Sequence, residues 1–109
     1  QQFPTSALQA ILMDAETGTV LFEKNADASM APASMAKVMA VEVILDEVRQ
    51  GRISPDSEFT ISENAWRRGG GASGGSSMFA QVNSRVKLSD LLQGIIVQSG
   101  NDASIAVAE

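Results

Sequence analysis

Histidine and cysteine are both absent from the 109-residue sequence. Their absence excludes a Ser-His-Asp triad, a Cys-His pair and a zinc site built from the usual ligands. It decides nothing about the redox compartment, because a chain without cysteine is compatible with either one. If this protein performs covalent catalysis, serine and lysine must carry it. We expect neither a metal nor another cofactor.

Positive charge is also scarce, with 8 Lys and Arg against 13 Asp and Glu and a net charge of −5. The basic residues are scattered, and Arg67-Arg68 is the only adjacent pair. A nucleic-acid ligand requires a basic surface that neutralises phosphates. We therefore expect no nucleic-acid partner. No apolar run approaches the roughly 18–20 residues of a membrane span.

The length and the apolar share of 44% predict one ordered domain at most. The first residues, Gln1–Thr5, lack a basic region followed by an apolar stretch. We therefore expect no signal peptide in this chain. Two origins for this end remain open, namely a mature end after signal removal and an engineered start.

A β-hairpin is predicted near the start of the chain. Leu8–Asp14 and Thr19–Lys24 are short, mostly apolar runs, and Ala15–Gly18 between them carries a glycine where a turn needs a positive φ. Further along, Glu58–Ser62 alternates in polarity and predicts a short strand. Glu63–Arg68 predicts about one helical turn.

Two longer helices are predicted, at Ser34–Gln50 and Ser89–Gln98, followed by another helical run over residues 102–109. Gly51 supplies the usual stop for the first helix. The apolar residues of that helix cover more than one stripe, so we expect its first half to be buried. The glycine- and serine-rich segment 69–77 is expected to be a loop near a site; it lacks the Gly-Lys-Ser/Thr ending of a phosphate loop.

Ser34-Met35-Ala36-Lys37 places a hydroxyl and an amine on one helical face. A serine hydroxyl needs a base within hydrogen-bond reach, and Lys37 can be that base if its surroundings keep it neutral. Alone the pair is weak evidence, since Ser34 could be only a helix N-cap and Lys37 only a solvated charge.

Ser99-Gly100-Asn101 connects the second long helix to the next helical run. Serine, glycine and asparagine are common in turns, and Asn101 could be only a helix N-cap. The combination of a Ser-x-x-Lys pair with a later Ser-x-Asn motif is typical of one class of serine acyl enzymes.

These residues resemble the penicillin-binding D-alanyl-D-alanine carboxypeptidases, the serine peptidases of the bacterial cell wall. The match extends nearly from end to end but covers only the N-terminal portion of that family. Four segments carry it: Asp14–Leu21 like the first hairpin, Pro32–Met39 like the nucleophile segment (with Ala36 where threonine is usual), and Gly75–Phe79 and Leu91–Glu109 like the second motif region.

The resemblance implies an α+β fold of the β-lactamase/transpeptidase kind, an α/β/α sandwich with helices on both faces of an antiparallel sheet. This chain would supply only the first hairpin and the helical part. It also implies roles for four residues. Ser34 would become acylated, Lys37 would accept its proton, Ser99 would relay a proton to the leaving amine, and Asn101 would hold Lys37 and the amide of the substrate.

The third motif of the family, Lys-Thr-Gly on a strand of the sheet, does not occur in these 109 residues. We therefore expect residues 1–109 to be the N-terminal part of a catalytic domain, truncated before that strand and inactive alone. The remainder of the same polypeptide, or a second copy, would complete the sheet. The other expected partners are peptidoglycan stem peptides ending in D-Ala-D-Ala and β-lactams, in the periplasm or cell envelope.

Two rival functions remain at this stage. A serine β-lactamase shares the nucleophile, but it usually has Ser-Asp-Asn and a deacylating glutamate, so Gly100 favours the peptidase. The second rival function is that of a non-catalytic fragment or interaction module. The sequence leaves open the oligomeric state, any membrane anchor and the preference for carboxypeptidase or endopeptidase substrates.

Overall fold

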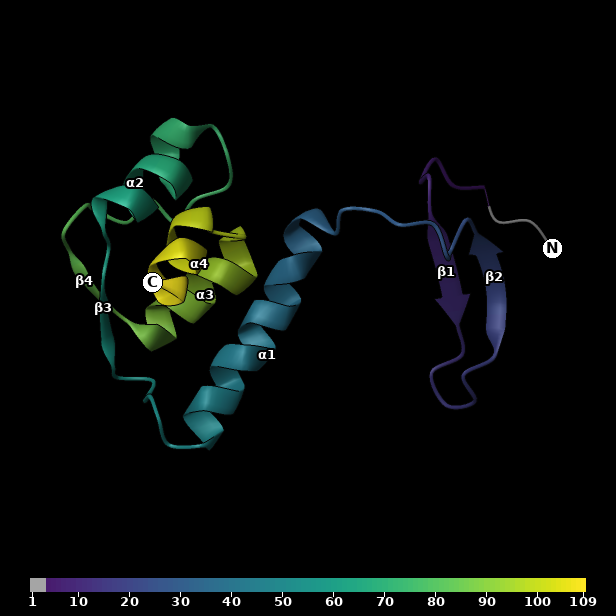
Figure 1. Cartoon of the computed structure of the whole chain (residues 1–109), viewed down its shortest axis with the longest axis horizontal. Coiled ribbons are helices and arrows are strands. Elements are labelled where there is room, and N and C mark those ends of the chain that lie inside the picture. The colour runs from purple at the N-terminus through teal and green to yellow at the C-terminus, as the bar shows by residue number, and fades with distance from the viewer. Residues whose placement is uncertain (1–3) are drawn as a thin grey trace. The chain divides into compact units, whose positions relative to one another are not determined.

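The structure is a computed structural model that describes residues 4–109. It divides into two compact units, with the boundary between Ala31 and Pro32. The first unit holds a β-hairpin, and the second holds the helices and a small two-stranded sheet (Figure 1). Each unit is described by itself.

The hairpin of the first unit pairs β1 (Ala10–Met13) with β2 (Val20–Lys24) in antiparallel fashion, which confirms the prediction. Gly18, with φ of +72°, supplies the positive φ that the turn needs. Asp14 closes the turn, because its carboxylate accepts hydrogen bonds from the N–H (2.8 Å) and the hydroxyl (2.8 Å) of Thr17. These bonds, led by the backbone one, lower the pKa of Asp14.

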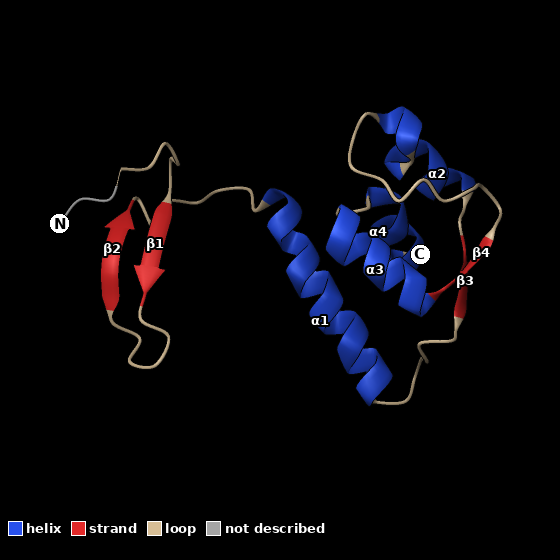
Figure 2. Cartoon of the chain, turned by 180° about the vertical axis from the view of Figure 1, so that it is seen from behind, coloured by secondary structure: helices blue, strands red, loops and turns tan. Residues whose placement is uncertain are grey.

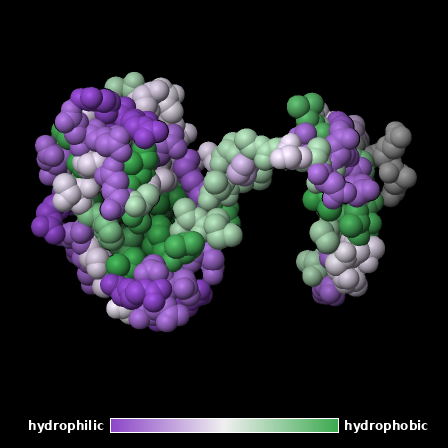
Figure 3. Space-filling model, in the orientation of Figure 1, coloured by the Kyte–Doolittle hydropathy of each residue, from purple (hydrophilic) through white to green (hydrophobic). Residues whose placement is uncertain are grey.

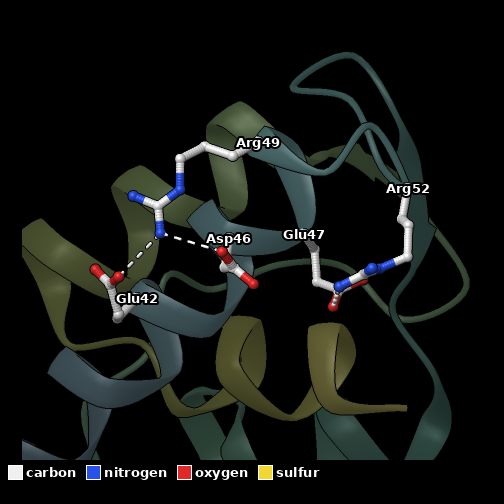
Figure 4. A network of polar contacts seen from close by, with 5 residues as sticks. All are labelled: Glu42, Asp46, Glu47, Arg49 and Arg52. Atoms are coloured by element: carbon white, nitrogen blue, oxygen red, sulfur yellow. Dashed lines mark hydrogen bonds and ion pairs between the residues drawn. The ribbon is translucent and has the colours of Figure 1, made fainter.

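The first long helix begins with a 3-10 turn at Ala33–Met35 and continues as α1 (Ala36–Arg49). Gly51 follows with φ of +74°, as its role as the stop residue predicts. The C-terminal half of α1 carries a polar network on its surface (Figure 4). In it Arg49 pairs with Glu42 and Asp46.

A small antiparallel sheet joins β3 (Glu58–Thr60) to β4 (Arg85–Lys87), with Phe59 opposite Val86. The strand at Glu58–Ser62 was predicted, whereas β4 was not. The small sheet thus joins a strand that the sequence predicts to one that it does not. Strand β4 is three residues long, with a single apolar residue between two charged ones, which is too short for a pattern to reveal it.

The remaining helices are α2 (Glu63–Gly69), α3 (Leu88–Gln98) and α4 (Asn101–Ala108), with a 3-10 turn at Gly71–Ser73. The hydroxyl of Ser62 caps α2 by accepting from the N–H of Ala65 at 2.9 Å. Helices α2, α3 and α4 pack together, and α1 lies along α3 (Figure 2). The buried apolar side chains of this core are Ile44, Ile61, Ala65, Leu88, Leu91, Ile95, Ala103 and Ala106. The chain has an α+β fold.

The predicted burial of the first half of α1 is wrong for this chain. Met35, Val38 and Met39 are 61%, 73% and 67% exposed, and Ile44 alone is buried among the fourteen residues of α1, all of which the structure describes. Within the unit 32–109, α1 packs on α3 with one face, so its other apolar residues remain at the surface. Figure 3 shows apolar residues at the surface of the protein. Within residues 4–109, no helix combines the length and hydropathy needed to cross a membrane.

Candidate active site

Ser34 and Lys37 lie at the start of the first helix, on the 3-10 turn and the first turn of α1. The ammonium Nζ of Lys37 donates a hydrogen bond to Oγ of Ser34 at 3.2 Å. Ser34 is exposed and Lys37 is partly buried. The spacing of three residues therefore brings the hydroxyl and the amine together, as the sequence predicts.

Ser99 reaches the same amine from the other end of the sequence. It ends α3 in the left-handed region, with φ of 53° and ψ of 39°. This conformation turns the chain sharply, and the following N–H of Gly100 donates to the carbonyl of Gly94 at 2.9 Å. Nζ of Lys37 donates to Oγ of Ser99 at 3.0 Å. The amine thus lies within hydrogen-bond distance of two hydroxyls.

Asn101 begins α4, and its backbone N–H donates to the carbonyl of Ser76 at 2.9 Å. Its side-chain Nδ2 lies beside Gly75, where a Cβ would come within 2.8 Å of it. The glycine-rich segment is therefore next to this candidate residue, as expected for a loop near a site. Among the described residues, however, the hydrogen bonds of Lys37 go to Ser34 and Ser99, and the structure shows none to the Asn101 amide.

A pocket of about 400 Å³ opens beside these groups, between α1 and α3. Ser34, Lys37 and Ser99 line it, together with four apolar side chains and one carboxylate. The other lining residues are Val38, Val41, Glu42, Ile95 and Ile96. A largely apolar pocket with a few convergent polar groups is the usual form of a small-molecule site.

Asp102 is a buried residue near this site that the sequence analysis did not single out. Its side chain is fully buried and accepts four hydrogen bonds. The available signal was a carboxylate directly after Ser99-Gly100-Asn101, at the start of a helix whose other residues are apolar or small. Within residues 4–109, no three carboxylates come close enough together to hold a metal ion.

The D-alanyl-D-alanine carboxypeptidase family matches residues 1–109, the full length of the chain. The chain belongs to this family. It is 42% identical over 100 residues to the D-alanyl-D-alanine carboxypeptidase DacC of Escherichia coli, an alignment covering 91% of this chain and 25% of DacC. It is 37% identical over 103 residues to DacF of Bacillus subtilis, covering 94% of this chain and 25% of DacF.

The structure agrees with the sequence match. Penicillin binding protein 5 of Haemophilus influenzae superposes with a TM-score of 0.87 at 38% identity, covering all of this chain and 31% of that protein. The chain thus spans about a quarter of the length of the curated carboxypeptidases named above.

Proposed function

We propose that the protein containing this chain is a serine-type D-Ala-D-Ala carboxypeptidase that forms an acyl-enzyme on Ser34. The observation that carries the proposal is the position of the Lys37 amine, 3.2 Å from Oγ of Ser34 and 3.0 Å from Oγ of Ser99. A single basic nitrogen between two hydroxyls can activate one as a nucleophile and use the other to pass a proton onward. Membership in the carboxypeptidase family supports the choice of substrate.

In the first step, Oγ of Ser34 attacks the carbonyl carbon between the two D-alanines while Nζ of Lys37 takes the hydroxyl proton. Lys37 must be neutral to accept that proton. The negative charge then develops on the carbonyl oxygen. The backbone N–H of Ser34, at the start of the helix, is one donor that could stabilise this charge.

In the second step, the C–N bond breaks and the terminal D-alanine leaves with a proton on its amine. The proton returns from Lys37 through the hydroxyl of Ser99, which already contacts Nζ. Water then attacks the ester carbonyl, which frees the shortened peptide and restores Ser34. One acyl-enzyme thus forms on Ser34 and is hydrolysed in each turnover.

Asn101 and Ser99 are the proposed substrate-binding residues. Asn101 begins the helix directly after the Ser99 turn, so a peptide held against Ser99 lies near its amide. The pocket between α1 and α3 would receive the apolar part of the peptide. We assign no metal or other cofactor to this reaction.

We further propose that residues 1–109 form the N-terminal part of a β-lactamase/transpeptidase-like catalytic domain. The remainder of the polypeptide, or a second copy, would supply the other strands of the sheet. The exposed apolar residues on the 3-10 turn and the first turn of α1 support this, because Met35, Val38 and Met39 would otherwise remain in water. Residues 1–109 alone are then inactive. β-Lactams are the expected inhibitors and the cell envelope the expected location, given the similarity to penicillin binding protein 5.

The test is release of D-alanine from a peptide ending in D-Ala-D-Ala by the full-length protein, with a β-lactam as inhibitor. Ser34→Ala should abolish release, and Ser29→Ala, at an exposed serine of the first unit, should leave it unchanged. Rapid turnover of the β-lactam without release of D-alanine would overturn the proposal in favour of a β-lactamase. Normal release by Ser34→Ala would overturn the role of Ser34.

A further inference from the structure

The carboxylate of Asp102 is completely buried, yet both of its oxygens are fully used. Oδ1 accepts from the backbone N–H groups of Met78 (3.0 Å) and Ala103 (2.9 Å). Oδ2 accepts from the hydroxyl of Ser77 (3.0 Å) and the backbone N–H of Ala80 (3.0 Å). A buried carboxylate is costly unless its hydrogen bonds are satisfied, and here four donors satisfy it.

Three of the four donors belong to the segment 77–80, which follows the glycine-rich loop. This segment has no helix or strand of its own. Its conformation is unusual, because Phe79 has a φ of +59° and its N–H donates to the hydroxyl of Ser77 at 2.9 Å. The carboxylate of Asp102 therefore binds three of the four residues of this segment, namely Ser77, Met78 and Ala80.

The same segment is joined to the turn that carries Ser99. The carbonyl of Ser76 accepts from the N–H of Asn101 at 2.9 Å. A Cβ at Gly100 would lie 3.1 Å from Oδ1 of Asp102 and 3.3 Å from the backbone nitrogen of Met78, so the turn is enclosed on this side. On another side a Cβ at Gly69, the last residue of α2, would overlap the backbone nitrogen of Asp102.

Such support matters for Ser99, because the left-handed conformation is uncommon for a residue other than glycine and costs free energy that the surrounding structure must offset. Its Oγ meets Lys37 only if the turn keeps this shape. The reactive groups of an active site must be held close to their productive geometry by the packing and hydrogen bonds of the residues around them.

We propose that Asp102 is a positioning residue of this active site. By binding the segment 77–80 to the start of α4, its carboxylate fixes the Ser99–Asn101 turn and so sets Oγ of Ser99 against Nζ of Lys37. Asp102 itself lines neither side of the Ser34 pocket. The expected effect of Asp102 on acylation rests on the proposed function. Its role in fixing the Ser99–Asn101 turn rests on the hydrogen bonds alone.

Asp102→Asn is the sharpest variant, because it keeps the shape of the side chain. Whichever way the new amide is turned, its NH₂ group faces a backbone N–H donor, from either Met78 or Ala80. Asp90→Asn is the matched control, since Asp90 also lies in the first turn of a helix but is exposed. Ser77→Ala removes one donor to Oδ2 and is the milder variant should Asp102→Asn fail to fold.

The measurement is covalent labelling of the full-length protein by a fluorescent penicillin, which separates the labelled fraction at saturation from the rate constant of acylation. We expect Asp102→Asn to label fully but on the order of 10- to 100-fold more slowly. Ser77→Ala should slow acylation less, and Asp90→Asn should match the wild type. Amide hydrogen exchange at Met78, Ala80 and Asn101 should become faster in Asp102→Asn.

Two outcomes would overturn the inference directly. One is acylation of Asp102→Asn, or of Ser77→Ala if the former does not fold, at the wild-type rate. The other is a smaller labelled fraction with an unchanged rate constant, which would mean that Asp102 only stabilises the fold. A wild-type protein that takes no label would instead refute the proposed function. Amide exchange then still decides the structural part, and unchanged exchange would overturn it.

Discussion

Nζ of Lys37 lies 3.0 Å from Oγ of Ser99, although the two residues are 62 positions apart in the sequence. The packing of α1 along α3 produces this contact, and the left-handed turn at Ser99 aims the hydroxyl toward α1. The contact matters because it links two motifs that are each weak evidence alone. Together with Ser34, they form the proton-transfer unit of the proposed mechanism.

Replacing Lys37 by arginine should abolish acylation. A guanidinium keeps the positive charge but cannot accept the proton of Ser34, since it stays protonated in proteins. Labelling by a fluorescent penicillin measures this. Lys87→Arg is the control, because Lys87 is exposed, its Nζ lies 3.9 Å from Oδ1 of Asp56, and it does not line the pocket beside Ser34. Normal acylation by Lys37→Arg would show that another group is the base.

Replacing Ser99 by alanine should slow D-alanine release by about 10²–10⁴-fold, the usual contribution of one proton-transferring group. The variant retains the nucleophile and the base but loses the hydroxyl that contacts Lys37. Ser89→Ala, near the start of α3, serves as the control. If steady-state release by Ser99→Ala equals that of the wild type, the relay through Ser99 is wrong.

Two glycines near the site should respond differently to alanine. At Gly69 the new methyl group would overlap the backbone of Asn101 and Asp102, which cannot move away, so we expect destabilisation of about 1–3 kcal/mol or more. At Gly75 the nearest atom is the side-chain Nδ2 of Asn101, at 2.8 Å. That amide can rotate, so Gly75→Ala should fold but raise KM. Thermal melts and steady-state kinetics separate the two effects, and equal stability losses would contradict the distinction.

The ion pair of Glu47 and Arg52 gives a prediction on pH. Both nitrogens of the guanidinium that face Glu47 lie 2.6 Å from its carboxylate oxygens (Figure 4), and this hydrogen bonding lowers the pKa of Glu47 from its ordinary 4.5. A lowered folded-state pKa adds stability above pH 4.5 that is lost as pH falls through the folded value.

Glu47→Gln should therefore reduce the melting temperature slightly at pH 7, and the difference from the wild type should vanish at acidic pH. The effect is small because the Arg52 side chain is exposed and the Glu47 side chain is partly exposed. A difference that persists unchanged at pH 2 would mean that the carboxylate charge is not the cause.

Local signals in the sequence predicted most elements of the fold. Gly18 and Gly51 marked the hairpin turn and the end of the first helix, and both have the positive φ expected of them. The predicted helix at Ser89–Gln98 begins one residue earlier in the structure. These features depend on neighbouring residues, which is why a pattern in the sequence reveals them.

Features that depend on distant residues were harder to predict. Strand β4 exists because Arg85–Lys87 pairs with Glu58–Thr60, and its own three residues carry little signal. The sequence of α1 does not reveal which of its apolar side chains pack against another element. Within the described residues, Val38 stays exposed. In the sequence, Asp102 looks like an ordinary carboxylate at the start of a helix. Its hydrogen bonds to Ser77 and Ala80 come from a loop more than twenty residues earlier, which no local pattern reveals.

The central claim is that Ser34 is the acylated nucleophile, and peptide mapping tests it most directly. The full-length protein would be treated with a penicillin, digested and analysed by mass spectrometry. We predict one adduct, on the peptide containing Ser34, and none in Ser34→Ala. An adduct on Ser99 or another residue, or one that survives Ser34→Ala, would contradict the account.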